Sequence, residues 1–174
     1  MKPLVLLTGP PGVGKTTALR RVCAGLRIRT LRGFYTEEVR DRGVRQGFRL
    51  ATFDGEERTI ADVRRLGPPR VGKYGVDVAA IDAVARRVLA PDPTVALFVI
   101  DEIGKMECLA RGFVEAVRGL LARSQPLLAT VALRGEGLIE EVKRDPRARL
   151  VHLTRENRDR LPGEVERMVE PGPG

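Results

Sequence analysis

The stretch Gly9-Pro-Pro-Gly-Val-Gly-Lys-Thr16 decides the fold of this chain. It follows the short apolar run at residues 4–7, which is typical of a buried strand, and leads into residues 16–26, where apolar side chains recur at helical spacing. Glycines allow such a loop to curl so that successive backbone N–H groups point inward, and the helix adds the positive end of its dipole. The pattern G-x-x-x-x-G-K-[ST] therefore predicts a phosphate-binding loop between a strand and a helix.

Each residue of this loop has an expected role in holding a triphosphate. Lys15 should neutralise the β- and γ-phosphates, which makes it a candidate catalytic residue, and the Thr16 hydroxyl should ligate Mg²⁺. A glycine-rich turn without a ligand is the weaker interpretation, because every fixed position of the pattern matches. The predicted nucleotide-binding residues here are Gly9, Pro10, Pro11, Gly12, Val13, Gly14, Lys15, Thr16 and Thr17.

A pair of acids supplies the second chemical signal. Asp101 follows the continuous apolar run at residues 95–100, at the position where P-loop proteins hold Mg²⁺ through an aspartate, so we predict it as the second metal-site residue. Parallel strands bring their carboxyl ends to one edge of a sheet, where the phosphate loop also lies. Glu102 is the candidate general base, which would accept a proton from a water in line with the γ-phosphate or orient that water. A solvated loop acid is the alternative.

Strands and helices alternate along most of the chain, which predicts an α/β, three-layer P-loop fold with a mainly parallel sheet and helices on both faces. Between residues 32 and 60, short aromatic strands and Gly-containing turns indicate antiparallel hairpins. We expect one domain over residues 1–174, with a β-rich insertion at 32–76 and a flexible tail at 171–174. The other expected elements are helices at 78–89, 106–122 and 138–144, strands at 95–100, 127–132 and 150–153, and a terminal helix.

Composition restricts the class of protein. The 174 residues are 43% hydrophobic and 31% charged, which is ordinary for a globular domain, and no apolar run is long enough for a signal peptide or a membrane span. Two cysteines without metal spacing, Cys23 and Cys108, suit small core positions in a reducing compartment. A single histidine, His152, argues against zinc chemistry and a Ser/His/Asp triad. We expect a cytoplasmic monomer without a membrane partner.

The net charge of +8 raises the question of a nucleic-acid partner. The basic residues are interleaved with acids and only 4% of residues are aromatic, so platforms for stacking single strands are scarce. A triphosphate is itself a polyanion and explains a positive field more simply. Nucleic acid is therefore disfavoured as the main partner. Scarce amide side chains and abundant charge are compatible with a thermophilic source, although a GC-rich genome gives a similar bias.

Five stretches, in order along nearly the whole chain, form a pattern: Gly9-Pro-Pro-Gly-Val-Gly-Lys-Thr16, Gly33-Phe-Tyr-Thr-Glu-Glu-Val-Arg40, Gly72-Lys-Tyr-Gly-Val76, Asp101-Glu-Ile-Gly-Lys-Met-Glu107 and Thr154-Arg-Glu-Asn-Arg-Asp159. Together they resemble the THEP1-type nucleoside-triphosphatase family. The resemblance implies an α/β P-loop fold, Mg²⁺-dependent hydrolysis of several nucleoside triphosphates to diphosphate and phosphate, and likeness to small-molecule kinases. It also implies that residues 101–107 line the nucleotide site, which adds Ile103, Gly104, Lys105, Met106 and Glu107 to Asp101 and Glu102. Cys108 replaces a more usual leucine.

Some residues in these motifs keep two interpretations. Lys105 is either a phosphate contact or a surface residue at a helix start. Lys73 and Tyr74 either contact a base or phosphate from a mobile loop or form a tight turn with an anchored aromatic. Asn157 does not complete an N-K-x-D motif, so guanine selectivity is not indicated, and Thr154 is a candidate cap for the last helix. The sequence does not choose between Arg134, Arg144 and Arg147 for an arginine finger.

The leading functional hypothesis is a nucleoside triphosphatase with broad base specificity. A nucleotide or small-metabolite kinase remains the first alternative, because residues 32–76 could form an acceptor pocket. A nucleotide-dependent, RNA-associated switch is the second, in which binding rather than turnover is the output.

Overall fold

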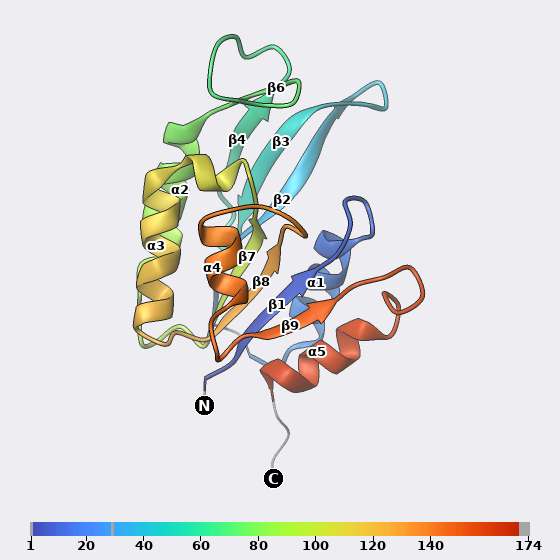
Figure 1. The fold of residues 1–174 in the computed structure, drawn as a ribbon, viewed down its shortest axis with the longest axis vertical. Coiled ribbons are helices and arrows are strands. Elements are labelled where there is room, and N and C mark those ends of the chain that lie inside the picture. Colours follow the sequence, from blue (N-terminus) through green and yellow to red (C-terminus); the bar gives the residue numbers. More distant parts are fainter. Residues whose placement is uncertain (1, 29, 171–174) are drawn as a thin grey trace.

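A mixed sheet forms the centre of the molecule (Figure 1), whose computed structural model describes residues 2–28 and 30–170. The predicted tail at residues 171–174 lies outside this part of the chain. Within it, nine strands follow the order β5-β6-β4-β3-β2-β7-β8-β1-β9. The strands are β1 (Leu4–Thr8), β2 (Leu31–Asp41), β3 (Val44–Thr52), β4 (Glu57–Asp62), β5 (Arg70–Val71), β6 (Tyr74–Val76), β7 (Leu97–Ile103), β8 (Leu127–Val131) and β9 (Arg149–His152).

The central parallel strands of this sheet, β1, β7 and β8, are buried on both faces, whereas the edge strand β9 is mostly exposed. β1 pairs in parallel with β8 and β9, and β7 pairs in parallel with β8 and with the start of β2. Leu4 and Leu6 of β1 enter one hydrophobic core, whereas Val5 and Leu7 enter the other. Strands covered on both sides need apolar residues at every position, which explains the continuous apolar runs in the sequence.

Helices cover both faces of the sheet (Figure 1), and they leave the loops at the carboxyl ends of the parallel strands along one edge. α2, α3 and α4 pack on the face that contains Leu4 and Leu6, and α1 and α5 pack on the opposite face. The helices are α1 (Lys15–Gly25), α2 (Val78–Val88), α3 (Arg111–Ala122), α4 (Leu138–Lys143) and α5 (Leu161–Val169), with the short 3₁₀ turn η1 (Glu107–Leu109) before α3. Among the described residues, no helix has the length and apolarity needed to cross a membrane.

The predicted antiparallel region is the second half of the same sheet. β2 is shared, because residues 31–34 pair in parallel with β7 while residues 34–41 pair antiparallel with β3. Gly33 lies at this junction with φ 131°, and a Cβ there would come within 1.9 Å of the Val99 carbonyl oxygen. Only glycine suits this close approach in the left-handed region. The segment is therefore continuous with the core.

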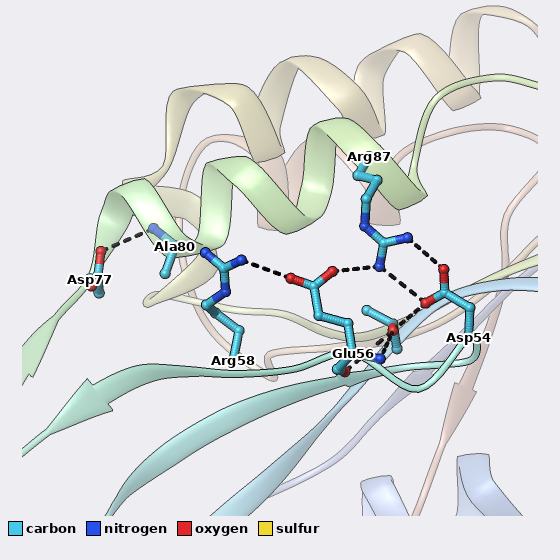
Figure 2. A network of polar contacts seen from close by, with 7 residues as sticks. Asp54, Glu56, Arg58, Asp77, Ala80 and Arg87 are labelled. Carbon is cyan, nitrogen blue, oxygen red and sulfur yellow. Dashed lines mark hydrogen bonds and ion pairs between the residues drawn. The ribbon is translucent and has the colours of Figure 1, made fainter.

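An ionic network attaches the antiparallel half to α2 (Figure 2). Arg87 of α2 pairs with Asp54, in the turn between β3 and β4, at 2.5 Å and with Glu56 at 2.6 Å. Arg58 pairs with the other oxygen of Glu56 at 2.9 Å. The pKa of Asp54 lies well below its usual range because of the hydrogen bond from Arg87. This charged contact helps to keep the β3–β4 hairpin over α2.

The elements around the acidic motif differ from the prediction. β7 was expected to end at residue 100, but it continues through Asp101 and Glu102 to Ile103, with a register shift against β8. The peptide bond between the two acids is cis. The helix expected at 106–122 is divided into η1 and α3, because Ala110 is extended, with φ −89° and ψ 112°. The residues of the acidic motif thus form a strand end and a tight turn.

Candidate active site

The phosphate loop joins β1 to α1 at the carboxyl edge of the sheet. Gly12 and Gly14 adopt positive φ angles of 77° and 106°, and the loop is held by the Val13 N–H, which donates to the Pro10 carbonyl at 3.2 Å. Gly9 is needed for packing, because a Cβ at this position would lie 2.6 Å from the Leu153 carbonyl oxygen. The glycines therefore act in two ways: two of them turn the loop, and the first admits the neighbouring segment.

Asp101 and Thr16 meet at this edge, as the strand order requires. The Thr16 hydroxyl donates to Asp101 Oδ2 at 2.7 Å. Asp101 is only 1% exposed, and its carboxylate also accepts from the Thr130 hydroxyl at 2.5 Å and from the Thr36 N–H at 3.2 Å. Burial raises the pKa of Asp101, while these donors and the charge of Lys15 oppose that rise. The carboxylate is thus fixed in place with a hydroxyl beside it.

Thr36 and Thr130 are site residues that sequence reasoning missed. Thr36 lies in β2, just beyond the part that pairs with β7, and its hydroxyl also donates to the Asp101 carbonyl at 2.5 Å. Thr130 lies in β8, the other neighbour of β7. Nothing local in the sequence singles out either threonine, because only the strand order places them on each side of Asp101. The resemblance did include Thr36 in a matching stretch, without a role.

Lys15 and Glu102 form the second pair in the site. Lys15 Nζ lies 3.5 Å from Glu102 Oε2 and donates to the Gly9 carbonyl at 3.1 Å. Burial raises the pKa of Glu102, and the charge of Lys15 opposes the rise. A carboxylate with a raised pKa is a stronger base than an exposed one. The two predicted catalytic side chains therefore lie together next to the phosphate loop.

The rest of the acidic motif divides between the surface and the interior. Ile103 and Gly104 are buried, Lys105 is exposed, and Met106 packs against the core. Glu107 is only 5% exposed, and burial together with the nearby Glu102 carboxylate raises its pKa to about 8. A Cβ on Gly104 would lie 2.7 Å from Glu102 Oε1 and 3.0 Å from Glu107 Oε2, so the two carboxyl groups flank this glycine.

Two of the three candidate arginine fingers lie far from the site. Arg147 donates to the Leu121 carbonyl at 3.0 Å, at the end of α3, and pairs with Asp145 at 2.6 Å. Because α3 runs from the carboxyl end of β7 back to the amino end of β8, Arg147 lies at the opposite edge of the sheet. Arg144, at the end of α4, lies at that same edge. Arg134 follows β8 directly on the carboxyl edge, so it is the remaining candidate.

The motif at residues 154–159 forms a loop beside the phosphate loop. The prediction that Thr154 caps the last helix is wrong, because α5 begins at Leu161. Thr154 instead pairs reciprocally with Asn157: its N–H donates to Asn157 Oδ1 at 2.8 Å, and its hydroxyl accepts from the Asn157 N–H at 3.3 Å. Arg158 Nη1 donates to the Val13 carbonyl of the phosphate loop at 3.5 Å.

Tyr74 is an anchored aromatic rather than a ligand contact. It is buried in β6, its ring lies edge-on to Phe48 at 5.1 Å, and its hydroxyl accepts from Arg45 Nε at 2.7 Å. Lys73 is exposed, with Nζ 5.5 Å from the Tyr74 ring. The strand order puts β6 four strands away from β7, so neither residue reaches the site.

Neither cysteine has a reactive environment. Cys23 and Cys108 are half-buried, and burial raises the pKa of each thiol to about 12. Both therefore stay protonated at neutral pH and serve as small core residues. No cluster of three or more His, Cys, Asp or Glu side chains that could hold a metal exists among the residues described.

The fold and the site together define a P-loop nucleotide-binding protein. A family model described as "NTPase" matches residues 4–166. The nucleoside-triphosphatase THEP1 of Thermotoga sp. (strain RQ2) is 37% identical over 162 residues, which cover 92% of each chain. The crystal structure of THEP1 from Aquifex aeolicus superposes with a TM-score of 0.85 at 33% identity and covers 95% of this chain and 98% of its own.

A human cancer-related nucleoside triphosphatase has a solution structure that superposes with a TM-score of 0.80 at 35% identity and covers 99% of this chain and 100% of its own. The chain therefore belongs to the THEP1-type nucleoside-triphosphatase family. This confirms the predicted family, the P-loop α/β fold and the class of enzyme, a phosphohydrolase.

Proposed function

We propose that this protein hydrolyses ATP, GTP and other nucleoside triphosphates to the diphosphate and phosphate, with Mg²⁺ and little selectivity for the base. The observation that carries this proposal is the convergence of two pairs, Thr16 with Asp101 at 2.7 Å and Lys15 with Glu102 at 3.5 Å, at the start of α1. A phosphate cradle, oxygen ligands and a carboxylate base are the parts that triphosphate hydrolysis needs.

The residues at this site fit a magnesium ion. Mg²⁺ prefers oxygen ligands and keeps several waters, and a hydroxyl and a carboxylate that touch each other are a suitable donor set. Thr16 and Asp101 would hold the ion, which neutralises charge on the phosphates when bound. Thr36 and Thr130 keep the Asp101 carboxylate aimed at this position.

The protein's own side chains supply the remaining steps. The loop N–H groups bind phosphate oxygens, and Lys15 balances the charge that develops on the leaving diphosphate and on the transferred group. Glu102 orients the attacking water and accepts its proton. Lys15 lies 3.5 Å from Glu102, and the phosphates of a bound triphosphate would compete with this carboxylate for the lysine and leave it free to act as the base.

A kinase remains the alternative, and one observation favours it. A hollow of about 250 Å³, lined by residues of α1, β2 and the end of β3, opens on the β2 side of α1. Arg20 and the ring of Tyr35 form part of its wall, with the guanidinium 4.4 Å from the ring centre. This hollow is smaller than ordinary ligand pockets, which measure roughly 300–1,000 Å³. Phosphate transfer would require this small hollow to hold an acceptor, whereas hydrolysis requires only water, so hydrolysis is the preferred function.

The test is phosphate release from ATP, GTP, CTP and UTP with Mg²⁺ and without an acceptor. We expect modest turnover with all of them, differing by about ten- to thirtyfold, and loss of activity with a chelator. Lys15→Ala, which removes the cation, should lower turnover by about a hundredfold or more while the protein stays folded. Phosphate release that needs a nucleoside, monophosphate or sugar, with a phosphorylated product found by mass spectrometry, would identify a kinase instead.

A further inference from the structure

The geometry of the site gives a bound triphosphate a direction along the edge of the sheet. Asp101 and Glu102, which serve the γ-phosphate end, come from β7, and the phosphate loop follows β1. In the strand order β7-β8-β1-β9, β9 lies on the other side of β1 from β7. A nucleotide whose γ-phosphate faces β7 therefore extends its nucleoside toward β9 and the loop that follows it.

That loop, residues 153–160, is held firmly beside the phosphate loop. The Leu153 N–H donates to the Thr8 carbonyl at 2.7 Å, directly before the phosphate loop begins. Asn157 Nδ2 donates to the His152 carbonyl at 2.8 Å, in addition to the reciprocal pair with Thr154. Asp159 lies 3.5 Å from the guanidinium of Arg21 in α1. These contacts give the side chains of this loop a defined position at the nucleoside end.

Arg158 is the side chain that this loop directs to the phosphate loop. Its Nη1 donates to the Val13 carbonyl at 3.5 Å. In a phosphate cradle the N–H groups point inward at the anion and the carbonyls point outward. The bond to the Val13 carbonyl therefore holds the guanidinium against the backbone of the phosphate loop, and Arg158 reaches it from the β9 side, which is the nucleoside end.

We propose that Arg158 is the base-binding residue of this enzyme and that its guanidinium stacks on the base of the bound nucleotide. A guanidinium is flat, weakly hydrated and well suited to stacking on aromatic faces. Every base offers such a face, so stacking holds purines and pyrimidines without reading their edges. The inference rests on the proposed function, because it gives broad base specificity a physical origin in one residue.

The test compares ligands with and without a base. Binding of ATP, CTP and inorganic tripolyphosphate to the full chain is measured by calorimetry with Mg²⁺, alongside kcat and KM for ATP and CTP. Arg158→Ala should weaken ATP and CTP binding by about five- to thirtyfold and raise KM to match, while kcat and tripolyphosphate affinity stay unchanged. Arg158→Lys should restore little of the nucleotide affinity, because lysine keeps the positive charge but lacks the planar guanidinium that stacks on a base. Arg158 is exposed, and thermal unfolding of each variant checks that the fold is retained.

Arg160→Ala is the matched control, since Arg160 lies in the same loop, is exposed, and pairs only weakly with Glu164 at 3.7 Å. It should leave the affinities for all three ligands unchanged. If Arg158→Ala weakens the binding of tripolyphosphate and of the nucleotides equally, and lysine restores it, Arg158 is a phosphate contact and the proposal is overturned. The proposal is also overturned if Arg158→Ala changes none of these affinities. Because the calorimetric comparison needs no turnover, a protein that binds nucleotides but does not hydrolyse them would refute the proposed function alone.

Discussion

Replacing Glu107 by glutamine should change how the stability of this protein depends on pH. The carboxyl group of Glu107 is buried next to Glu102, and the backbone of Gly104 and of Glu107 itself only partly opposes the rise in its pKa. Burial, and then the negative charge of Glu102, favour its neutral form. Glutamine has nearly the same shape and carries no charge at any pH. Glu107→Gln therefore removes one titrating group while it preserves the packing.

The size of the effect follows from the pKa of Glu107, which is raised from 4.5 to about 8. Between these values the folded state holds a proton that the unfolded state has released, so stability falls as pH rises. The fall is up to about 1.4 kcal/mol per pH unit and ends above about pH 8. The full shift of about 3.5 units corresponds to an upper bound of about 5 kcal/mol, a large part of an ordinary stability of about 5–15 kcal/mol.

Urea unfolding of the nucleotide-free protein at several values between pH 5.5 and 8.5 measures this effect. Relative to wild type, the free energy of unfolding of Glu107→Gln should rise by up to about 3 kcal/mol over this range. The wild-type protein loses stability as pH rises because its unfolded chain releases the Glu107 proton that the folded state retains, and the glutamine variant has no such proton. Glu115→Gln, at an exposed position of α3, is the matched control and should follow the wild-type profile. If the difference in stability between Glu107→Gln and wild type is the same at every pH, the reasoning about the buried carboxyl group is wrong.

Two further predictions concern the acids and the strand junction. Glu102→Gln should keep nucleotide and Mg²⁺ affinity but lose about a hundred- to ten-thousandfold in kcat, whereas Asp101→Asn should raise the Mg²⁺ concentration needed for activity. If both variants needed the same raised Mg²⁺ concentration and lost the same factor in rate at saturating Mg²⁺, these separate roles would be contradicted. Gly33→Ala should destabilise the fold by about 3 kcal/mol or more in urea unfolding, because its Cβ would meet the Val99 carbonyl at 1.9 Å. Gly55→Ala, with a similar φ of 94° but nothing within 4 Å, should cost about 1–2 kcal/mol, and an equal loss in both would refute the close-approach argument.

The local patterns of the sequence were sufficient to predict much of the fold and to bring together the two residue pairs of the candidate site. Residues 9–16 predict the phosphate loop because glycines, a lysine and a threonine at that spacing form a local structure of their own. The apolar run before Asp101 predicts a buried parallel strand, and parallel strands place their carboxyl ends together. Lys15, Thr16, Asp101 and Glu102 could therefore be assigned to one site from short segments and one general property of sheets.

The tertiary structure decided everything that depends on which strands are neighbours. Thr36 and Thr130 hold Asp101 only because β2 and β8 lie near β7, and the side of β1 taken by β9 brings Arg158 to the phosphate loop. Arg147, which the sequence ranked equally with Arg134, lies at the opposite edge because α3 returns there. Hydrophobic periodicity reports which faces of a segment are buried, but segments with similar faces can be arranged in several strand orders. Contacts between distant residues follow from that order, and it is settled only when the complete core packs.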